Sequence, residues 1–236
     1  MGPIQLVVFD MAGTTIDDKG GVVLNALVET ARHYELPGTP EELNALMGMN
    51  KREVFGMLAA QLYPTDETRA ERLADTALVG FVARMRAAYE AYLAPMPGAE
   101  ETFAYLRGRG IKIATDTGFD STIGGLIMER LDWPGRLIDL AIYSSDVSLG
   151  RPAPYMIFRA MERLGVLDVR RVMKLGDSPA DLEEGINAGC GEVIGVLSGA
   201  HTATTLGAYR HTRLIGSVAD LPALFEHAEQ ERESFS

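Results

Sequence analysis

One aspartate of this chain stands where a parallel sheet would present it as a nucleophile. Asp10 follows the apolar run Leu6 to Phe9 and precedes a Gly-Thr-Thr turn. A carboxylate is therefore expected at the carboxyl edge of a sheet, where open α/β folds bind ligands. A second acid two residues later could act as a general acid and base, but Ala12 occupies that place and cannot transfer a proton.

A second acidic site follows the apolar run Val172 to Leu175. It reads Gly-Asp-Ser-Pro-Ala-Asp, and Asp177 is its first acid. Asp10 and Asp177, at neighbouring strand ends, could hold a hard cation such as Mg²⁺, which prefers oxygen ligands. Asp181, four residues further along a helix, could steady a water or a ligand. The alternative is that Asp177 only caps this helix.

The run D-M-A-G-T-T, which begins at Asp10, resembles the first motif of the haloacid dehalogenase (HAD) superfamily. Phosphatases of this superfamily carry D-x-D, whereas the alanine variant is similar to that of phosphonoacetaldehyde hydrolases. The resemblance covers residues 1–16 and 93–217 and depends on the order of the motifs. It implies an aspartyl nucleophile, a small phosphonate or phosphate substrate, and Mg²⁺ held by Asp10, Asp177 and the backbone carbonyl of Ala12.

The resemblance also implies which residues hold the phosphoryl group. The hydroxyl of Thr117 and the N–H groups that follow it, from Gly118 on, would bind the phosphoryl oxygens. Arg151, in a G-R-P context, would bind a phosphoryl group or a carboxylate with two N–H groups. The alternatives are a turn-capping threonine and a surface arginine. Gly13 and Met47 are also predicted to contact substrate, although methionines often only fill packing gaps.

Because Ala12 cannot act as an acid, another group must activate the leaving group, and Lys51 is the candidate. Asn50 and Glu53 have the spacing of an N-cap and N3 pair, so a helix is predicted to start at Lys51. An ammonium at a helix amino terminus, next to Arg52, is disfavoured, which lowers the pKa of Lys51. Phosphonoacetaldehyde hydrolases carry a similar M-G-x-x-K segment, whose lysine forms a Schiff base with the substrate aldehyde.

The missing acid and the added lysine are chemically consistent with each other. Cleavage of a P–C bond expels a carbanion, and an iminium on Lys51 would accept its electrons while Asp10 takes the phosphoryl group. Phosphonoacetaldehyde hydrolases typically carry a histidine three residues after this lysine, whereas this chain has Val54. The substrate could therefore be phosphonoacetaldehyde or a related phosphonate that carries a carbonyl.

Apolar, β-rich runs alternate with helical patterns along most of the chain. This alternation predicts an α/β fold with a doubly wound parallel sheet. The predicted strands are Leu6 to Phe9, Ile111 to Ala114, Leu140 to Tyr143, Val172 to Leu175, Val193 to Val196 and Arg213 to Ile215. The predicted core helices are Ala99 to Arg109, Thr122 to Leu131, Tyr155 to Leu164 and Pro179 to Ala188.

Residues 18–92 contain no strand pattern and are too many for one crossover. They predict an inserted helical cap domain, with the core formed by residues 1–17 and 93–236 and with hinges near 17–21 and 95–98. The predicted cap helices are Val22 to Tyr34, Pro40 to Met47, Lys51 to Leu62 and Glu67 to Tyr92. The polar residues after His227 are expected to be frayed.

Composition limits the partners and the compartment. Thirty-three acidic and 22 basic residues leave a net charge of −11, which argues against nucleic acid and anionic membranes as partners. A single cysteine and an amino terminus without a basic region or a myristoylation signal predict a cytoplasmic protein. The resemblance implies a homodimer formed through the cap.

Three functions remain open from the sequence. The first is hydrolysis of the P–C bond of phosphonoacetaldehyde or a close analogue. The second is ordinary hydrolysis of phosphate monoesters whose leaving group needs no acid. The third is a decayed active site that is kept as a binding module, for which Ala12 would be the sign.

Overall fold

The structure is a computed structural model that describes residues 3–233, and its strands form a six-stranded parallel sheet. The strands lie across the sheet in the order β3-β2-β1-β4-β5-β6. Their bounds are β1 Leu6–Asp10, β2 Lys112–Thr117, β3 Leu140–Tyr143, β4 Val172–Gly176, β5 Glu192–Val196 and β6 Arg213–Ile215.

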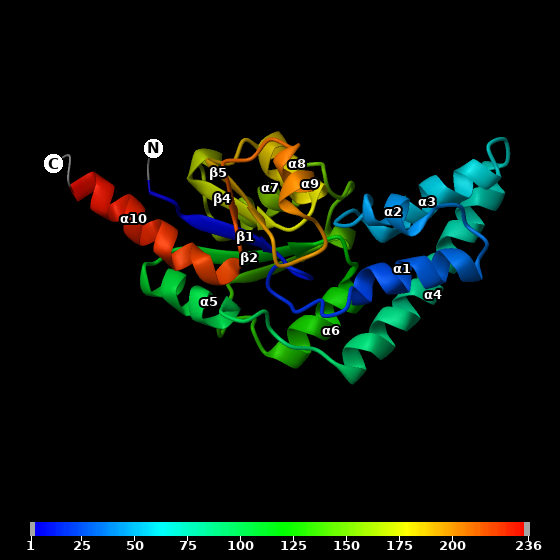
Figure 1. Ribbon diagram of the computed structural model, residues 1–236, viewed down its shortest axis with the longest axis horizontal. Helices are drawn as coiled ribbons and strands as arrows, with labels where there is room; N and C mark the ends of the chain where they lie inside the picture. Colours follow the sequence, from blue (N-terminus) through cyan, green and yellow to red (C-terminus); the bar gives the residue numbers. More distant parts are fainter. Residues whose placement is uncertain (1–2, 234–236) are drawn as a thin grey trace.

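Helices cover both faces of this sheet, as a doubly wound fold requires (Figure 1). The predicted α/β fold class is therefore confirmed. On one face lie α7 (Tyr155–Leu164), α8 (Pro179–Ala188) and the short α9 (Ala203–Gly207). On the other face lie α5 (Ala99–Gly108), α6 (Ser121–Leu131) and α10 (Leu221–Glu233), the last of which packs on α5.

The central strand β1 marks the point where the strand order reverses. It pairs with β2 on one side and with β4 on the other. All five residues of β1 are buried, which explains why a continuous apolar run forms this strand. Ligands of open α/β sheets bind at such a switch point, beside the carboxyl ends of the strands. Asp10 ends β1 and Asp177 directly follows β4, so both acids reach this place.

The helices between β1 and α5 form a group at one end of the sheet, which we call the cap (Figure 1). Within it α4 contacts both α1 and α3. The all-helical insertion agrees with the prediction, and the division at residues 17 and 93 stays a prediction. The cap helices are α1 (Val22–His33), α2 (Pro40–Asn44), α3 (Lys51–Leu62) and α4 (Glu67–Ala91).

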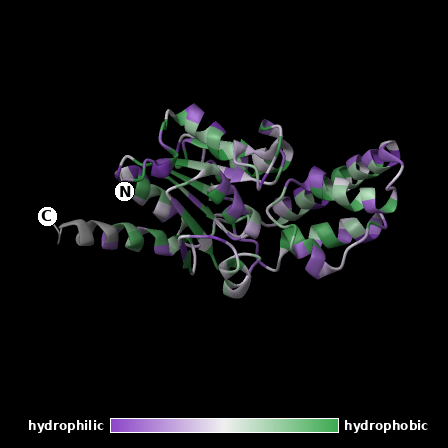
Figure 2. Cartoon of the chain, turned by 90° about the horizontal axis from the view of Figure 1, so that it is seen from above, coloured by the Kyte–Doolittle hydropathy of each residue, from purple (hydrophilic) through white to green (hydrophobic). Residues whose placement is uncertain are grey.

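The chain passes between core and cap twice, and the two connections run side by side. The amide of Asp17 donates to the carbonyl of Ala94 at 3.0 Å, and the amide of Met96 donates to the carbonyl of Thr15 at 2.8 Å. Figure 2 shows hydrophobic residues along the strands and a mixture of both kinds on the cap helices. One buried apolar cluster continues from Phe9 in the sheet to Phe55 in the cap.

Some predicted bounds were wrong. Strand β2 continues to Thr117 through polar residues that are buried, and α2 ends at Asn44 instead of Met47. Helices α9 and α10 were not predicted, and α10 extends past His227, where fraying was expected. Among residues 3–233, no helix combines the length and the apolar character that crossing a membrane requires.

Candidate active site

The turn after β1 holds Asp10 at the edge of the sheet. The hydroxyl of Thr15 donates to the carbonyl of Asp10 at 2.8 Å. Gly13 has φ +86°, and a Cβ there would lie 2.7 Å from Oδ2 of Asp177, so only glycine fits this turn. Burial, followed by the charge of Asp181, raises the pKa of Asp10 to about 6, although Arg151 opposes the shift.

Lys51 lies in the same pocket as Asp10. It is the first residue of α3, where the side chain of Asn50 caps the amides of Arg52 and Glu53. Its side chain is 4% exposed, and its Nζ donates to the carbonyl of Met49 at 2.9 Å. Burial lowers the pKa of Lys51 to about 8, against the charge of Asp10, which raises it.

We call this pocket the inner pocket, and its volume is about 20 Å³. It is lined mainly by residues that the sequence singled out, from both the core and the cap. Among the predicted site residues, Gly13, Arg151 and Asp181 do not line it. The lining residues are Asp10, Ala12, Val23, Met47, Gly48, Lys51, Thr117, Gly118, Phe119 and Asp177.

Thr117 ends strand β2 at the inner pocket, and Gly118 follows it. The hydroxyl oxygen of Thr117 accepts a hydrogen bond from the amide of Phe119 at 3.2 Å. Thr117 therefore stabilises the turn as well as facing the pocket. A Cβ on Gly118 would lie 2.5 Å from the carbonyl oxygen of Met49. Glycine at this position therefore lets the cap segment approach the end of β2 closely.

Asp177 is a buried carboxylate that faces the inner pocket. Its Oδ2 accepts the amide of Ala200 at 2.6 Å. Burial and the charges of Asp10 and Asp181 raise its pKa well above the usual range. The alternative that Asp177 caps α8 is wrong, because Ser178 is the N-cap and forms a capping box with Asp181.

Arg151 lies behind Asp10, fully buried among four carboxylates. Its Nη1 donates to Oδ1 of Asp10 at 2.7 Å and lies 2.8 Å from Oδ1 of Asp181. Its Nη2 donates to Asp116, and its Nε lies 3.1 Å from Oε2 of Glu184. The alternative of a surface arginine is therefore wrong. In this position the guanidinium orients the carboxylate of Asp10 and offsets its charge.

Three members of this cluster were not predicted from the sequence: Asp116, Lys174 and Glu184. Lys174 of β4 is fully buried; its Nζ donates to Asp116 and lies 3.1 Å from both Asp181 and Glu184. Burial would raise the pKa of Asp116, but Arg151 and Lys174 hold it below its usual range. A lysine inside an apolar strand was the available signal, because such a charge is rarely buried without partners.

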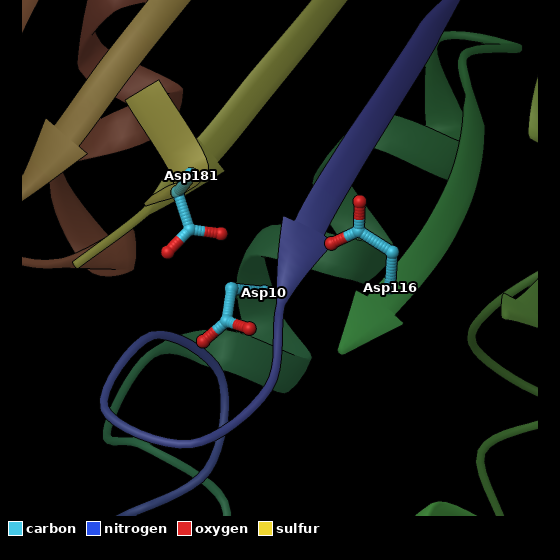
Figure 3. A group of neighbouring side chains, drawn as sticks. All are labelled: Asp10, Asp116 and Asp181. Carbon is cyan, nitrogen blue, oxygen red and sulfur yellow. The ribbon is translucent and has the colours of Figure 1, made fainter. Parts of the chain in front are cut away.

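The spacing of three carboxylates in this cluster would also suit a metal ion. Figure 3 shows Asp10, Asp116 and Asp181 as neighbours at the end of β1, and one carboxylate oxygen of each lies within 4.8 Å of the others. Arg151 and Lys174 already supply two positive charges to that space. These carboxylates are therefore better explained as partners of protein cations.

The donor set of Asp10, Asp177 and the carbonyl of Ala12 fits a hard cation better. Among residues 3–227, whose side chains the structure describes, no lysine, arginine or histidine forms an ion pair with Asp177, although its carboxylate is buried. A buried charge without a partner is costly, so an added cation would stabilise it. Oxygen is the only donor type in this set, which suits Mg²⁺.

The chain is similar to hydrolases of known families. A family model described as haloacid dehalogenase-like hydrolase matches residues 4–189. Phosphonoacetaldehyde hydrolase of Paraburkholderia xenovorans is 33% identical over 196 residues, which cover 80% of this chain and 73% of that protein. Phosphonoacetaldehyde hydrolase of Vibrio cholerae is 30% identical over 259 residues, which cover 97% of this chain and 96% of that protein.

Solved structures show the same fold. The crystal structure of a phosphonoacetaldehyde hydrolase-like protein from Oleispira antarctica has a TM-score of 0.78 and 22% identity. The match covers 97% of this chain and 94% of that one. At this identity the likeness supports the fold and not a particular activity.

Proposed function

This chain belongs to the haloacid dehalogenase-like hydrolases, and from that premise we propose that it hydrolyses the P–C bond of phosphonoacetaldehyde or a close carbonyl phosphonate. One observation carries the proposal: the buried amine of Lys51 lines the same pocket as Asp10, while position 12 holds alanine. The site thus has a carboxylate nucleophile and an amine, but no acid to protonate an alkoxide.

The reaction starts at Lys51. Its neutral amine attacks the carbonyl carbon, water leaves, and an iminium forms. A carboxylate oxygen of Asp10 then attacks phosphorus, and the electron pair of the P–C bond moves into the iminium to give an enamine. Protonation and hydrolysis of the enamine release acetaldehyde and free Lys51. Water cleaves the aspartyl phosphate, which releases phosphate and restores Asp10.

Phosphoryl transfer also needs positive charge near the transferring group. Asp10, Asp177 and the carbonyl of Ala12 would hold Mg²⁺, which would supply part of that charge when bound. Nη1 of Arg151 donates to Oδ1 of Asp10 at 2.7 Å and keeps this carboxylate oriented. Thr117 and the amides after it would bind the phosphoryl oxygens at the end of β2.

Trapping of the lysine tests the proposal directly. The chain has four lysines, Lys19, Lys51, Lys112 and Lys174, so a reduced adduct can be assigned by peptide mass. With phosphonoacetaldehyde and borohydride we expect inactivation and labelling of Lys51 alone. Lys51→Met should abolish acetaldehyde release and labelling, whereas Lys112→Met, at an exposed lysine, should retain both.

Other outcomes would favour the other functions. Hydrolysis of aryl phosphates that survives Lys51→Ala, with no trapped adduct, would indicate an ordinary phosphatase. An Asp10→Asn variant that leaves every measurable function unchanged would indicate a binding module. Release of phosphate and acetaldehyde together, dependent on Mg²⁺, is the result that the proposed reaction requires.

A further inference from the structure

A second cavity, of about 520 Å³, lies between the cap and the core, and we call it the outer cavity. Its cap side is formed by the start of α3 and the middle of α4. Its core side is formed by residues 118–123, after β2, and residues 144–149, after β3. It is much larger than the inner pocket, whose roughly 20 Å³ leaves room for about one water.

The two spaces are neighbours. Lys51, Gly118 and Phe119 line both the inner pocket and the outer cavity. In the proposed reaction, Lys51 bonds to the carbonyl carbon while phosphorus faces Asp10. A second substituent on that carbon must therefore leave the inner pocket near Lys51, where the outer cavity begins.

The wall of the outer cavity suits an alkyl chain. Leu78, Val82 and Val147 are half-buried, Leu149 is 48% exposed, and all four line the cavity. The guanidinium of Arg52, which also lines it, is paired with Asp75 at 3.1 Å. An apolar chain would lose contact with water there, while a second anionic group would meet the carboxylates of Glu53 and Asp120, which also line the cavity.

Building on the proposed P–C hydrolysis, we propose that this enzyme accepts 2-oxoalkylphosphonates and that the outer cavity receives their alkyl chain. The amine of Lys51 and the ketone give a ketimine and water. Asp10 takes the phosphoryl group, and the P–C electron pair forms an enamine. Protonation and hydrolysis give a methyl ketone and free Lys51, and a second water releases phosphate from Asp10.

A chain-length series tests the inference with the full-length protein. Four substrates, from 2-oxopropyl- to 2-oxohexylphosphonate, share the same reacting atoms and differ only in chain length. We expect kcat/KM to rise about four-fold per added methylene, the gain that burial of one methylene gives. Loss of that slope in Leu149→Trp would place the chain in the outer cavity, because Leu149 lines it and is 48% exposed.

A matched control is available at Leu167. This residue is 96% exposed and does not line the cavity, so Leu167→Trp should keep the slope of the wild-type enzyme. A flat series in the wild-type enzyme would overturn the inference. So would an equal loss in Leu149→Trp for all ketones and for phosphonoacetaldehyde, because the cavity would then be only an entrance.

The two proposals fail in different ways. Hydrolysis of phosphonoacetaldehyde without hydrolysis of any ketone in the series would overturn the alkyl subsite and leave the proposed function intact. Failure to cleave the aldehyde and the ketones alike, with no borohydride adduct on Lys51, would overturn both.

Discussion

The amine of Lys51 is placed between opposing electrostatic influences. Burial lowers its pKa to about 8 and so favours the neutral nucleophile, whereas the charges of Asp10, Asp177 and Asp181 favour the ammonium. The result lies near neutrality, where an amine is reactive and can still be protonated when it leaves. Lys51 is the first residue of α3, as predicted, and a helix amino terminus disfavours a positive charge, so this position also favours the neutral amine.

This balance predicts a pH dependence for P–C cleavage. The neutral amine attacks the carbonyl, so kcat/KM for phosphonoacetaldehyde should rise as the pH increases through about 8. Hydrolysis of an aryl phosphate by the same protein is the control, because it needs Asp10 but not Lys51. Initial rates of phosphate release measure both profiles. If the aldehyde profile shows no increase near 8, or the aryl phosphate shows the same one, Lys51 is not the nucleophile.

The sequence identified single residues better than it identified their partners. Asp10, Lys51, Thr117 and Asp177 were recognised from local motifs, and the structure brings them to one pocket. Asp116, Lys174 and Glu184 were missed, because a buried ion network is formed by residues from β2, β4 and α8. Local sequence carries no information on which charges meet across a sheet.

At the scale of elements, glycines let the cap segment after α2 approach the core. Gly48 has φ +82°, and a Cβ there would overlap Oγ of Ser178 at the start of α8. A Cβ on Gly150 would lie 2.9 Å from Cβ of Asn50. The amide of Gly150 also donates to Oε1 of Glu53 at 3.1 Å, so Glu53 ties α3 to the core instead of closing the predicted capping box.

A substitution at Gly48 should therefore separate cap from core. Gly48→Ala requires a strained backbone and displaces Lys51 from Asp10, and a shift of about 1 Å can cost roughly 100-fold in rate. Gly56→Ala is the control, because that position lies within α3 and its Cβ meets nothing within 4 Å. We expect Gly56→Ala to keep its activity and to gain about 1 kcal/mol in stability.

Steady-state kinetics and urea unfolding separate the two variants. Full P–C cleavage activity in Gly48→Ala would contradict the argument that this contact positions Lys51. An equal loss of activity in Gly56→Ala would show that any change in the cap segment is harmful, and that the contact with Ser178 has no particular role.

The predicted bounds of helices and strands are correct where the local sequence signals are strong. Helices α3, α7 and α8 have the predicted bounds, because N-caps, an apolar stripe or a first-turn proline define them. Strand β2 was predicted too short, since its last residues, Thr115 to Thr117, are polar. These residues are buried, with Asp116 paired to Arg151 and Lys174 and Thr117 at the inner pocket, so their polarity does not indicate exposure to solvent.

At the scale of the whole molecule, the cap closes over the site in this structure. His201 of the core lies 3.2 Å from the carbonyl of Asn44 in the cap and 3.1 Å from the carbonyl of Asp177. The inner pocket is too small to admit a phosphonate in this arrangement. Substrate must therefore enter when the cap moves about the paired connections near Asp17 and Ala94.

The homodimer expected from the family resemblance remains a proposal, and the cap offers a way to test it. Among the described residues, the cap helices expose Val79 (70%), Leu62 (41%) and Met57 (40%), while a net charge of −11 per chain opposes association. We expect light scattering to give twice the 25.6 kDa chain mass. Val79→Glu should then give monomers, because a buried charge without a partner weakens an apolar interface, whereas Leu167→Glu in the core should remain dimeric. A monomeric wild-type protein, or a dimer that tolerates Val79→Glu, would refute an interface at Val79.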